Sequence, residues 1–420
     1  MTVIARLDAP GCGCDAAQGL ASIDQALERI RALPRRKDTE DVPLAVAMGR
    51  VLARPVTARA NVPPFASSAM DGYALCAGDL IGDGPWVLPV SARIAAGDDA
   101  RAPLPPGHAA RIFTGGAVPG GADCVVMQEA VTAHPGRIEI RTRPTPGQNV
   151  RAVADDMGQG DVILPAGRRL TARDIAAAAA SGRASVTVTK ALRVALLLTG
   201  NEIVDQSHDL SPGQIWDVNG PMMAAMLTRP DVEITARAVA EDDADALTAQ
   251  IAALADMADL LITSGGISVG DTDLVKPSLL ALGGTIHLSG VAIKPGKPVS
   301  VGTLGRTAWL GLPGNPVSAH VIWQVFGTAL LDHLTGRQPV TARRHAVLAD
   351  PLEHKPGRCE MRPALLAGHD ANGREMVRFE GQTHSARVAT LARADGLILI
   401  PAEADHMRAG DLVEFLPFET

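Results

Sequence analysis

The chain has 420 residues, of which 46% are hydrophobic, so it is long enough for two to four domains with sizeable cores. Its formal net charge of −7 and its aromatic content of 3% argue against a basic groove with stacking platforms for nucleic acid. The 42 glycines and 30 prolines indicate turns inside folded domains rather than disorder, because no repeat or polar tract accompanies them.

The first residues and the cysteines indicate where the protein works. Charges interrupt the first apolar run and no stretch of about 18 apolar residues occurs, which predicts a cytoplasmic protein with no membrane partner. Five cysteines, with no Cys-x-x-Cys pair among them, suit a reducing compartment. Cys12 and Cys14 form one close pair that could chelate a metal or form a redox couple, but a pair without a partner cluster is more often incidental.

Two helical segments flank a region of different character. Ser22 opens a capping-box signature before an amphipathic helix that ends before Pro34, and a second signature opens at Thr171. Between these helices, short apolar runs alternate with Gly- and Pro-rich turns, without a helical period. We therefore predict a discontinuous helical and β linker domain, residues 1–60 plus 147–190, that carries an inserted mostly-β domain, residues 61–146.

The second half of the chain has the pattern of an α/β domain followed by a small β domain. From Leu192 onward, continuous apolar runs alternate with helical segments, which is typical of a parallel sheet covered on both faces. After Gly336 the chain breaks into short strand-like pieces. The predicted fold class is thus multidomain α/β and β, with a central parallel α/β domain over 191–335 and a C-terminal β domain over 336–420.

Glycine-rich loops follow three strands of the predicted α/β domain, where ligands of open α/β sheets bind. These loops begin at Thr199, Ser264 and Leu312. Glycine lets backbone N–H groups approach an anion, and a following helix N-terminus favours negative charge, so a phosphate fits. Asp271 and Asp273 would repel a bare phosphate, and they make sense if a hard divalent cation bridges both. The alternative is a carboxylate that caps the next helix and binds nothing.

Lysines are concentrated in the same part of the chain. The sequence has six, and three of them are Lys276, Lys294 and Lys297. The prolines of the turn 294–298 restrict the backbone, so two cations could face a polyanion at little entropic cost. Pro298 stands where a Walker A loop needs Ser or Thr, and no Gly-x-Gly-x-x-Gly follows the strands. A P-loop NTPase and a Rossmann dehydrogenase are therefore not supported, whereas a phosphate-bearing ligand is.

A second constellation lies at the entrance to the inserted domain. Residues 63–74 combine a diproline, two serines and an Asp-Gly turn, which make a preformed loop that presents the carboxylate of Asp71. Thr114 ends another strand-like run and is followed by two glycines. An Asx-type turn without a function is the alternative for Asp71.

Together these segments resemble the molybdopterin molybdenumtransferase family, which includes the E domain of gephyrin. The similar blocks extend over nearly the whole chain, at 68–74, 114–123, 147–156, 199–202, 264–276, 294–298 and 313–318. The resemblance implies an elongated four-domain subunit and a homodimer in which the α/β site faces the inserted domain of the partner. It also implies the insertion of molybdenum from molybdate into adenylylated molybdopterin, with release of AMP and with a divalent cation, usually Mg²⁺.

The resemblance further implies roles for single residues. Asp273 and Glu202 are expected to face the metal, while Asp71, Thr114 and Asp156 are expected to come from across the dimer cleft. Lys294 and Lys297 are expected to offset the charge of the substrate. The expected substrate-binding set is Ser264, Gly265, Gly266, Ser268, Gly270, Lys276, Pro313, Gly314, Asn315, Pro316 and, in the C-terminal domain, Ser385. Two positions depart from the family pattern: Asn201 stands where many members carry Asp, and Ala154 stands where Gly is usual before Asp156.

Two other functions stay open on the sequence alone. The α/β domain could perform the preceding adenylylation of molybdopterin, because the sister enzyme resembles this domain, although the insertion that carries Asp71 argues against it. The chain could also be a non-catalytic scaffold that binds partner peptides, as the gephyrin E domain does, although clustered charges in a glycine-rich crevice argue for catalysis. The predicted partners are the adenylyltransferase and apo-molybdoenzymes. The dithiolene sulfurs of the substrate, not protein cysteines, are expected to become the molybdenum ligands. Molybdate and tungstate are tetrahedral dianions of similar size, so the same donors suit both.

Overall fold

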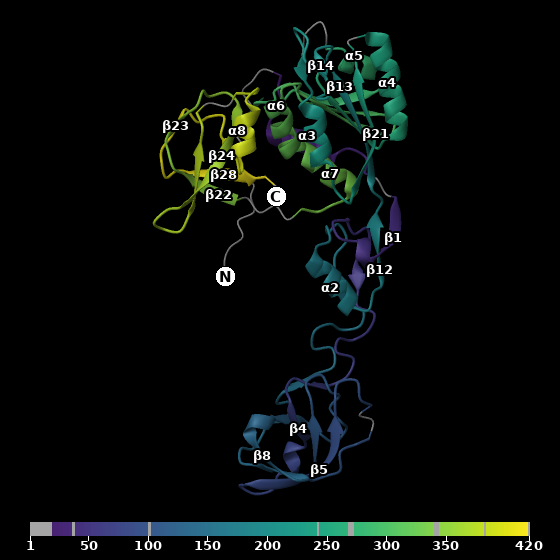
Figure 1. Ribbon diagram of the computed structural model, residues 1–420, viewed down its shortest axis with the longest axis vertical. Helices are drawn as coiled ribbons and strands as arrows, with labels where there is room; N and C mark the ends of the chain where they lie inside the picture. The colour runs from purple at the N-terminus through teal and green to yellow at the C-terminus, as the bar shows by residue number, and fades with distance from the viewer. Residues whose placement is uncertain are drawn as a thin grey trace.

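Figure 1 shows an elongated subunit with the β-rich insert at one end and the α/β domain at the other. The computed structural model describes residues 19–35, 38–99, 102–241, 243–267, 273–339, 344–381 and 384–418. Cys12 and Cys14 lie outside these ranges. Among the described helices, none is both long and apolar enough to cross a membrane.

A six-stranded sheet forms the centre of the α/β domain. Its strands, in spatial order, are β16 (Val232–Ala240), β13 (Leu192–Thr199), β17 (Leu260–Ser264), β21 (Thr307–Leu312), β20 (Ser300–Leu304) and β18 (Thr285–Ser289). The first four strands in this order are parallel to one another, as predicted, and β20 and β18 extend one edge in antiparallel fashion. The sheet is therefore mixed, but the strands that precede the three glycine loops all end at the same edge.

Helices cover both faces of this sheet because the side chains of each strand alternate between two cores. In β13, for example, Val194 and Leu196 enter one core, whereas Ala195 and Leu197 enter the other. The helices are α3 (Asn219–Met226), α4 (Ala244–Met257), α5 (Val275–Ala281), α6 (Pro316–Ile322) and α7 (Thr328–Thr335). A π-helical turn, Trp323–Gly327, joins α6 to α7, so the chain after the third loop forms one nearly continuous helix.

The linker domain is built from both sides of the insert. Strand β1 (Thr39–Pro43) pairs with β12 (Ser185–Thr189), and β2 (Val56–Thr57) pairs with β11 (Val162–Leu164) beside helix α2 (Ala172–Ala180). Helix α1 (Ile23–Arg31) has the predicted capping box, but its buried side chains pack in the α/β core with α7. Packing thus places α1 with the α/β domain, whereas the predicted boundaries group it with 147–190. The boundaries themselves stay predictions.

The inserted domain is a six-stranded sheet with a core on each face. The strands, in spatial order, are β7 (Cys124–Met127), β4 (Gly72–Leu75), β6 (Ala109–Ile112), β5 (Trp86–Ile94), β9 (Arg137–Ile140) and β8 (Val131–His134). Two short strands, β3 (Ser67–Ser68) and β10 (Val150–Arg151), pair where the chain enters and leaves it. No α-helix lies among the described residues of this region, in agreement with the mostly-β prediction.

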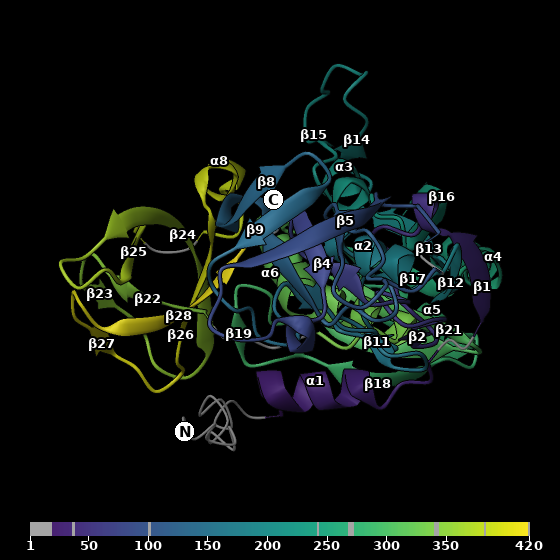
Figure 2. The ribbon, with the colours of Figure 1, turned by 90° about the horizontal axis from the view of Figure 1, so that it is seen from below.

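The C-terminal domain is a closed barrel. The ring is formed by β24 (Cys359–His369), β25 (Glu375–Phe379), β22 (Arg344–Leu348), β28 (Leu412–Pro417) and β26 (Gly396–Ile400), which pairs back with β24. Strands β23 (Leu352–Glu353) and β27 (His406–Met407) pair beside the ring, and helix α8 (Val388–Arg393) lies near β24. Figure 2 shows the barrel beside the α/β domain, from which β14 (Ile203–Val204) and β15 (Ile215–Trp216) extend as a separate ribbon.

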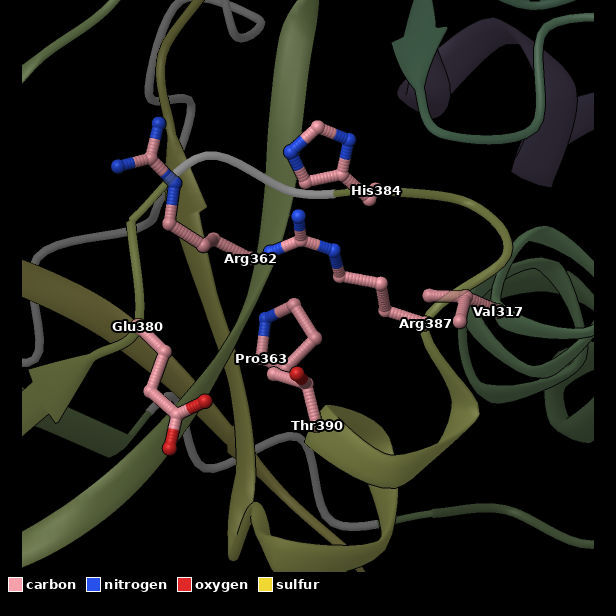
Figure 3. Close-up of a pocket in the computed structure, with 7 residues that line it drawn as sticks. All are labelled: Val317, Arg362, Pro363, Glu380, His384, Arg387 and Thr390. Carbon is pink, nitrogen blue, oxygen red and sulfur yellow. The ribbon is translucent and has the colours of Figure 1, made fainter.

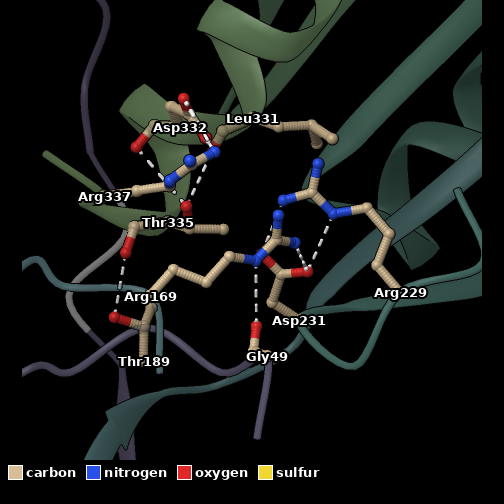
Figure 4. Close-up of polar contacts among 9 residues, drawn as sticks. All are labelled: Gly49, Arg169, Thr189, Arg229, Asp231, Leu331, Asp332, Thr335 and Arg337. Carbon is tan, nitrogen blue, oxygen red and sulfur yellow. Dashed lines mark hydrogen bonds and ion pairs between the residues drawn. The ribbon is translucent and has the colours of Figure 1, made fainter. Parts of the chain in front are cut away.

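A buried ion-pair group joins the linker domain to the α/β domain (Figure 4). The carboxylate of Asp231, 2% exposed, accepts hydrogen bonds from Arg229 at 2.8 and 2.9 Å and from Arg169 of the linker at 3.0 Å. Burial alone would raise the pKa of Asp231, but the hydrogen bonds and charge of Arg229 and the charge of Arg169 outweigh it and lower this pKa. A second contact runs from the Thr189 hydroxyl to the Thr335 carbonyl at 2.9 Å. The junction is thus held by interactions that solvent screens weakly.

We expect Asp231→Ala to lower the free energy of unfolding by about 3–5 kcal/mol, because it leaves two partly buried guanidinium groups without their shared anion. Urea unfolding followed by circular dichroism measures this. The control is Asp350→Ala, since Asp350 is 51% exposed in its ion pair with Arg378 and should lose no more than about 1 kcal/mol. Equal losses in the two variants would contradict a special role for the junction.

Candidate functional site

Three loops meet at the carboxyl edge of the sheet. Ser264, the last residue of β17, is in register with Leu198 of β13 on one side and with Leu312 of β21 on the other. The Gly265 N–H donates to the Leu312 carbonyl at 3.0 Å, and the Gly266 carbonyl accepts from the Val275 N–H at 3.1 Å. The structure therefore brings together the loops that the sequence predicted to form a cradle.

Glycine is required at the start of the middle loop. Gly265 and Gly266 have φ values of +93° and +63°, which side chains other than glycine rarely adopt. A Cβ at position 265 would lie 2.6 Å from the Thr199 hydroxyl oxygen and 2.8 Å from the Thr199 carbonyl oxygen. The two neighbouring loops thus approach each other closely because no side chain separates them.

Asn219, at the first position of α3, ties two of the loops together. Its Nδ2 donates to the Ser264 hydroxyl at 2.8 Å and to the Gly314 carbonyl at 2.6 Å, and the residue is 7% exposed. Its Oδ1 is buried and accepts no hydrogen bond from the part of the chain that the structure describes. Sequence reasoning missed Asn219. The available signal was Asp217, whose carboxylate accepts from the Gly220 N–H at 2.8 Å in a pattern typical of a helix start.

Two of the predicted carboxylates lie at this edge. Glu202 is exposed and folds over its own loop, since a Cβ at Gly200 would lie 2.6 Å from its Oε2. Asp273 is half-buried. Burial lowers the pKa of Lys276, and the negative charge of Asp273 partly offsets this effect. Lys276 also donates to the Ser289 hydroxyl at 3.3 Å. Ser268, Gly270 and Asp271 lie outside the described residues.

The donor chemistry of this edge suits a hard cation that also binds a ligand. Within the described ranges, no group of three or more His, Cys, Asp or Glu side chains is placed to hold a metal ion. Mg²⁺ is usually held by one or two carboxylates together with phosphate oxygens and water. Glu202 and Asp273 therefore fit a cation that the substrate helps to bind, and they do not form a closed protein site.

The lysine turn 294–298 packs against the helix that follows the third loop. Gly296 has a φ of +112°, and a Cβ there would lie 2.5 Å from Ile322 of α6. Lys297 is exposed. Lys294 instead forms an ion pair with Glu360 of the C-terminal barrel, with 3.2 Å between Nζ and Oε2. Sequence reasoning did not identify Glu360 as a partner.

A cationic pocket lies where the barrel meets the third loop (Figure 3). Its lining residues are Val317, Arg362, Pro363, Glu380, His384, Arg387 and Thr390. The Ser385 carbonyl accepts from the Val317 N–H at 3.2 Å, which places the predicted Ser385 beside the third loop. Glu380 is paired with Arg393 at 2.7 Å, and Arg362 is paired with Glu360 at 3.1 Å, so the pocket combines compensated charges with the cation of Arg387. We name this the C-terminal pocket; its arginines were not predicted from the sequence.

The predicted residues of the insert form a separate group. Asp71 Oδ1 accepts hydrogen bonds from both the backbone N–H and the hydroxyl of Thr114, each at 2.8 Å. The backbone bond, then the hydroxyl bond and then the charge of Arg111 lower the pKa of Asp71, and the small effect of burial does not cancel them. Asp156 lies in the connector to the linker domain, is exposed, and donates its N–H to the Val62 carbonyl at 2.9 Å.

Backbone contacts bring three predicted segments of the insert together. The Gly115 N–H donates to the Ser68 carbonyl at 2.8 Å, and the Ala69 N–H donates to the Asn149 carbonyl at 2.9 Å. This group lies on the insert, at the end of the subunit away from the α/β loops (Figure 1). One subunit therefore contains two clusters of predicted site residues, and they do not converge.

Comparison with known proteins defines the class of this chain. Three family models match it in succession: the MoeA N-terminal region (domain I and II) at 21–182, a probable molybdopterin binding domain at 195–333, and the MoeA C-terminal region (domain IV) at 345–418. The crystal structure of the molybdopterin biosynthesis moeA protein from Pyrococcus horikoshii matches with a TM-score of 0.80 at 26% identity, over 95% of this chain and 100% of that one. The fold is thus a multidomain MoeA fold, which confirms the predicted fold class.

Full-length relatives identify the family itself. The molybdopterin molybdenumtransferase of Nostoc sp. is 37% identical over 393 residues, which cover 90% of this chain and 88% of that protein. The molybdopterin molybdenumtransferase of Haemophilus influenzae is 33% identical over 403 residues, which cover 95% and 99%. The chain belongs to the molybdopterin molybdenumtransferase family, and the resemblance predicted from the sequence is confirmed.

We expect Gly265→Ala to cost about 2–4 kcal/mol of unfolding free energy, because it combines a strained φ with overlap on Thr199. Gly305→Ala is the matched control, since its φ is +57° but no atom lies within 4 Å of the added Cβ, and it should cost about 1 kcal/mol. Chemical denaturation of both variants checks the difference. A cost at position 265 no larger than at position 305 would show that the loops are not closely packed.

We expect Thr114→Val to raise the pKa of Asp71 while leaving it below its usual value, because the hydroxyl donor is lost and the backbone N–H remains. Titration of the side-chain carboxyl carbon by NMR measures this. Thr132→Val on the exposed face of β8 is the control and should leave the Asp71 pKa unchanged. An unchanged Asp71 pKa in Thr114→Val would contradict the contact.

Proposed function

We propose that this chain is a molybdopterin molybdenumtransferase, an enzyme that inserts molybdenum from molybdate into adenylylated molybdopterin and releases AMP. Family membership supports the reaction. The observation on this chain that carries the proposal is the meeting of three backbone loops, at Thr199, Ser264 and Leu312, at one sheet edge. Such an edge binds a phosphate-bearing ligand through backbone N–H groups.

The residues around the loops suit a polyanionic substrate. Lys297 belongs to the turn that packs against α6, the helix after the third loop, and Lys276 lies in α5, the helix after the second loop. Charge-assisted hydrogen bonds from such cations are the strong ones. Molybdate is an anion as well, so its approach to a phosphate needs several cations in a partly dry cleft. The C-terminal pocket supplies Arg362 and Arg387 beside the third loop. These groups together offset the repulsion between the two anions.

We further propose that Asp273 and Glu202 hold a divalent cation, most simply Mg²⁺. When bound, such a cation neutralises the carboxylates and draws phosphate oxygens to this edge of the sheet. The proposal rests on the donor set, because two carboxylates at a glycine cradle would otherwise repel the substrate. Asp273 and Glu202 orient the ligand through this shared charge, while the loop N–H groups fix its position.

A homodimer would complete the site. Asp71 and Thr114 are hydrogen-bonded to each other. They belong to the insert, which Figure 1 shows at the other end of the subunit from the α/β domain. We propose that a second subunit brings its Asp71, Thr114 and Asp156 to this edge. The exposed position of Asp156 in the connector is compatible with that arrangement.

The buried cysteines support the proposal that the dithiolene of the substrate, and not the protein, binds molybdenum. Burial raises the pKa of the Cys124 thiol to about 12 and that of Cys359 to about 11. A thiol binds a metal as the thiolate, so burial makes Cys124 and Cys359 poor candidates for molybdenum ligands. Neither Cys124 nor Cys359 forms a disulfide with a described residue, which is compatible with the cytoplasmic location that we propose.

The two alternatives make different demands on the molecule. An adenylyltransferase would not need the carboxylate that Asp71 presents on the insert, and a scaffold would not need carboxylates and lysines at a glycine cradle. We propose transfer of the product to apo-molybdoenzymes and receipt of the substrate from the adenylyltransferase. This place in the sequence of reactions follows from the chemistry of the adenylylated substrate.

We expect Asp273→Asn to reduce AMP release from adenylylated molybdopterin by at least about 100-fold, because it removes half of the cation site. Asp256→Asn is the control, because Asp256 is exposed in α4 away from the loops. AMP release and reconstitution of an apo-enzyme are followed with molybdate and, in parallel, with tungstate. AMP release by Asp273→Asn at the rate of the control would refute the role of Asp273, and ATP consumption with free molybdopterin would favour the adenylyltransferase.

A further inference from the structure

Glu360 is a buried carboxylate that touches cations from two different structural units. It is 1% exposed at the side chain and lies in β24 of the barrel. Lys294 Nζ of the lysine turn lies 3.2 Å from its Oε2, and Arg362 donates to its Oε1 at 3.1 Å. His354 Nε2 lies 3.8 Å from Oε2, while His354 Nδ1 faces the Ala404 carbonyl at 2.7 Å. A buried carboxylate in this position is costly unless its partners are held in place.

The backbone fixes Lys294 and Glu360 beside each other. Strand β19 (Ile293–Lys294) adds in parallel to β24, with Ile293 opposite Cys359 and Lys294 opposite Glu360. The Cys359 N–H donates to the Ala292 carbonyl at 3.1 Å, which continues this pairing. The first lysine of the turn 294–298 is thus a residue of the barrel sheet as well as of the α/β domain.

The second partner of Glu360 belongs to the C-terminal pocket. Arg362 lines that pocket with His384 and Arg387 (Figure 3). Its guanidinium is 4% exposed and also lies over the Phe379 ring, at 4.9 Å from the ring centroid. Glu360 therefore stands between the lysine turn and the cationic pocket and contacts one cation of each.

We propose that Glu360 is a positioning residue for the oxyanion substrate: its single carboxylate holds Lys294 and Arg362 at a fixed separation, so that an oxyanion at the mouth of the C-terminal pocket adjoins the polyanion at the lysine turn. This inference rests on the proposed function. Glu360 also compensates part of the charge of both cations before a substrate arrives. The barrel is then part of the reaction site, because it supplies the anchor of Lys294.

Two substitutions distinguish the effect of the Glu360 charge from the effect of its side-chain length. Glu360→Gln keeps the size of the side chain and removes its charge. The oxyanion then meets Lys294 and Arg362 with their charges uncompensated, and no carboxylate fixes the positions of these two cations. We expect the KM for molybdate to fall by about threefold or more and kcat to fall by about tenfold. Glu360→Asp keeps the charge but shortens the side chain, so kcat should fall while the KM stays within about twofold of the wild type.

Glu375→Gln is the matched control, because Glu375 pairs with Arg344 in the same barrel but is 28% exposed. It should change neither constant by more than about twofold. Circular dichroism and thermal unfolding report the folded fraction of each variant, and both constants are referred to folded protein. Calorimetric titration with tungstate alone gives the affinity for the oxyanion independently of turnover, and it should rise in Glu360→Gln.

The outcomes separate the inference from the proposed function. If the wild-type protein releases AMP with molybdate and both Glu360 variants keep its kcat and KM, the inference is wrong and the proposed function stands. A raised KM in Glu360→Gln, or a loss of kcat that only follows the folded fraction, also overturns the inference. If the wild-type protein shows no molybdenum insertion, the proposed function fails first. Should Glu360→Gln not fold, Glu360→Asp decides by its kcat.

Discussion

The parallel alignment of β13, β17 and β21 is the constraint on which the site depends. Because these strands run in one direction and share a register, their loops leave the sheet at one edge. Asn219 then joins the loops after β17 and β21 through two hydrogen bonds from one buried amide. Without this alignment, the glycines and carboxylates would be distributed over unrelated parts of the surface. The lysine turn packs against α6, the helix that follows the third loop, and the barrel contacts the start of the same helix through Ser385 and Val317.

The sequence predicts those parts of the site that depend on local pattern. Apolar runs followed by glycine indicated the loops, and the spacing of Ser22 and Gln25 indicated the first helix, because both signals act over a few residues. The partners of Asn219 lie 45 and 95 residues away, and Glu360 lies 66 residues from Lys294. Such contacts are fixed by which strands become neighbours, and no local period encodes this. The packing of α1 against α7, rather than in the linker domain, has the same origin.

The charges of the site are more balanced than the count of lysines suggested. The charge of Lys294 is compensated by Glu360. Burial lowers the pKa of Lys276, and the charge of Asp273 partly offsets this effect. Lys297 is exposed on the turn that packs against α6. A polyanionic ligand would therefore meet a cradle in which much of the positive charge is already paired, so its affinity depends on geometry as well as on charge. Backbone N–H groups, which carry no counter-ion, supply donors at no such cost.

The stiffness of the linker determines how the two clusters of one subunit can be used. The Asp231 group and the contact of Thr189 with Thr335 hold the linker to the α/β domain, so relative motion at that junction would break buried ion pairs. The insert is attached through the two chain segments around Val62 and Met157, which are bonded to each other. Asp71 and Thr114 belong to this insert, which Figure 1 shows at the other end of the subunit from the α/β domain. In this structure Asp71 and Thr114 therefore lie away from the α/β loops of their own subunit, and this separation supports the proposed dimer, in which two subunits share a site.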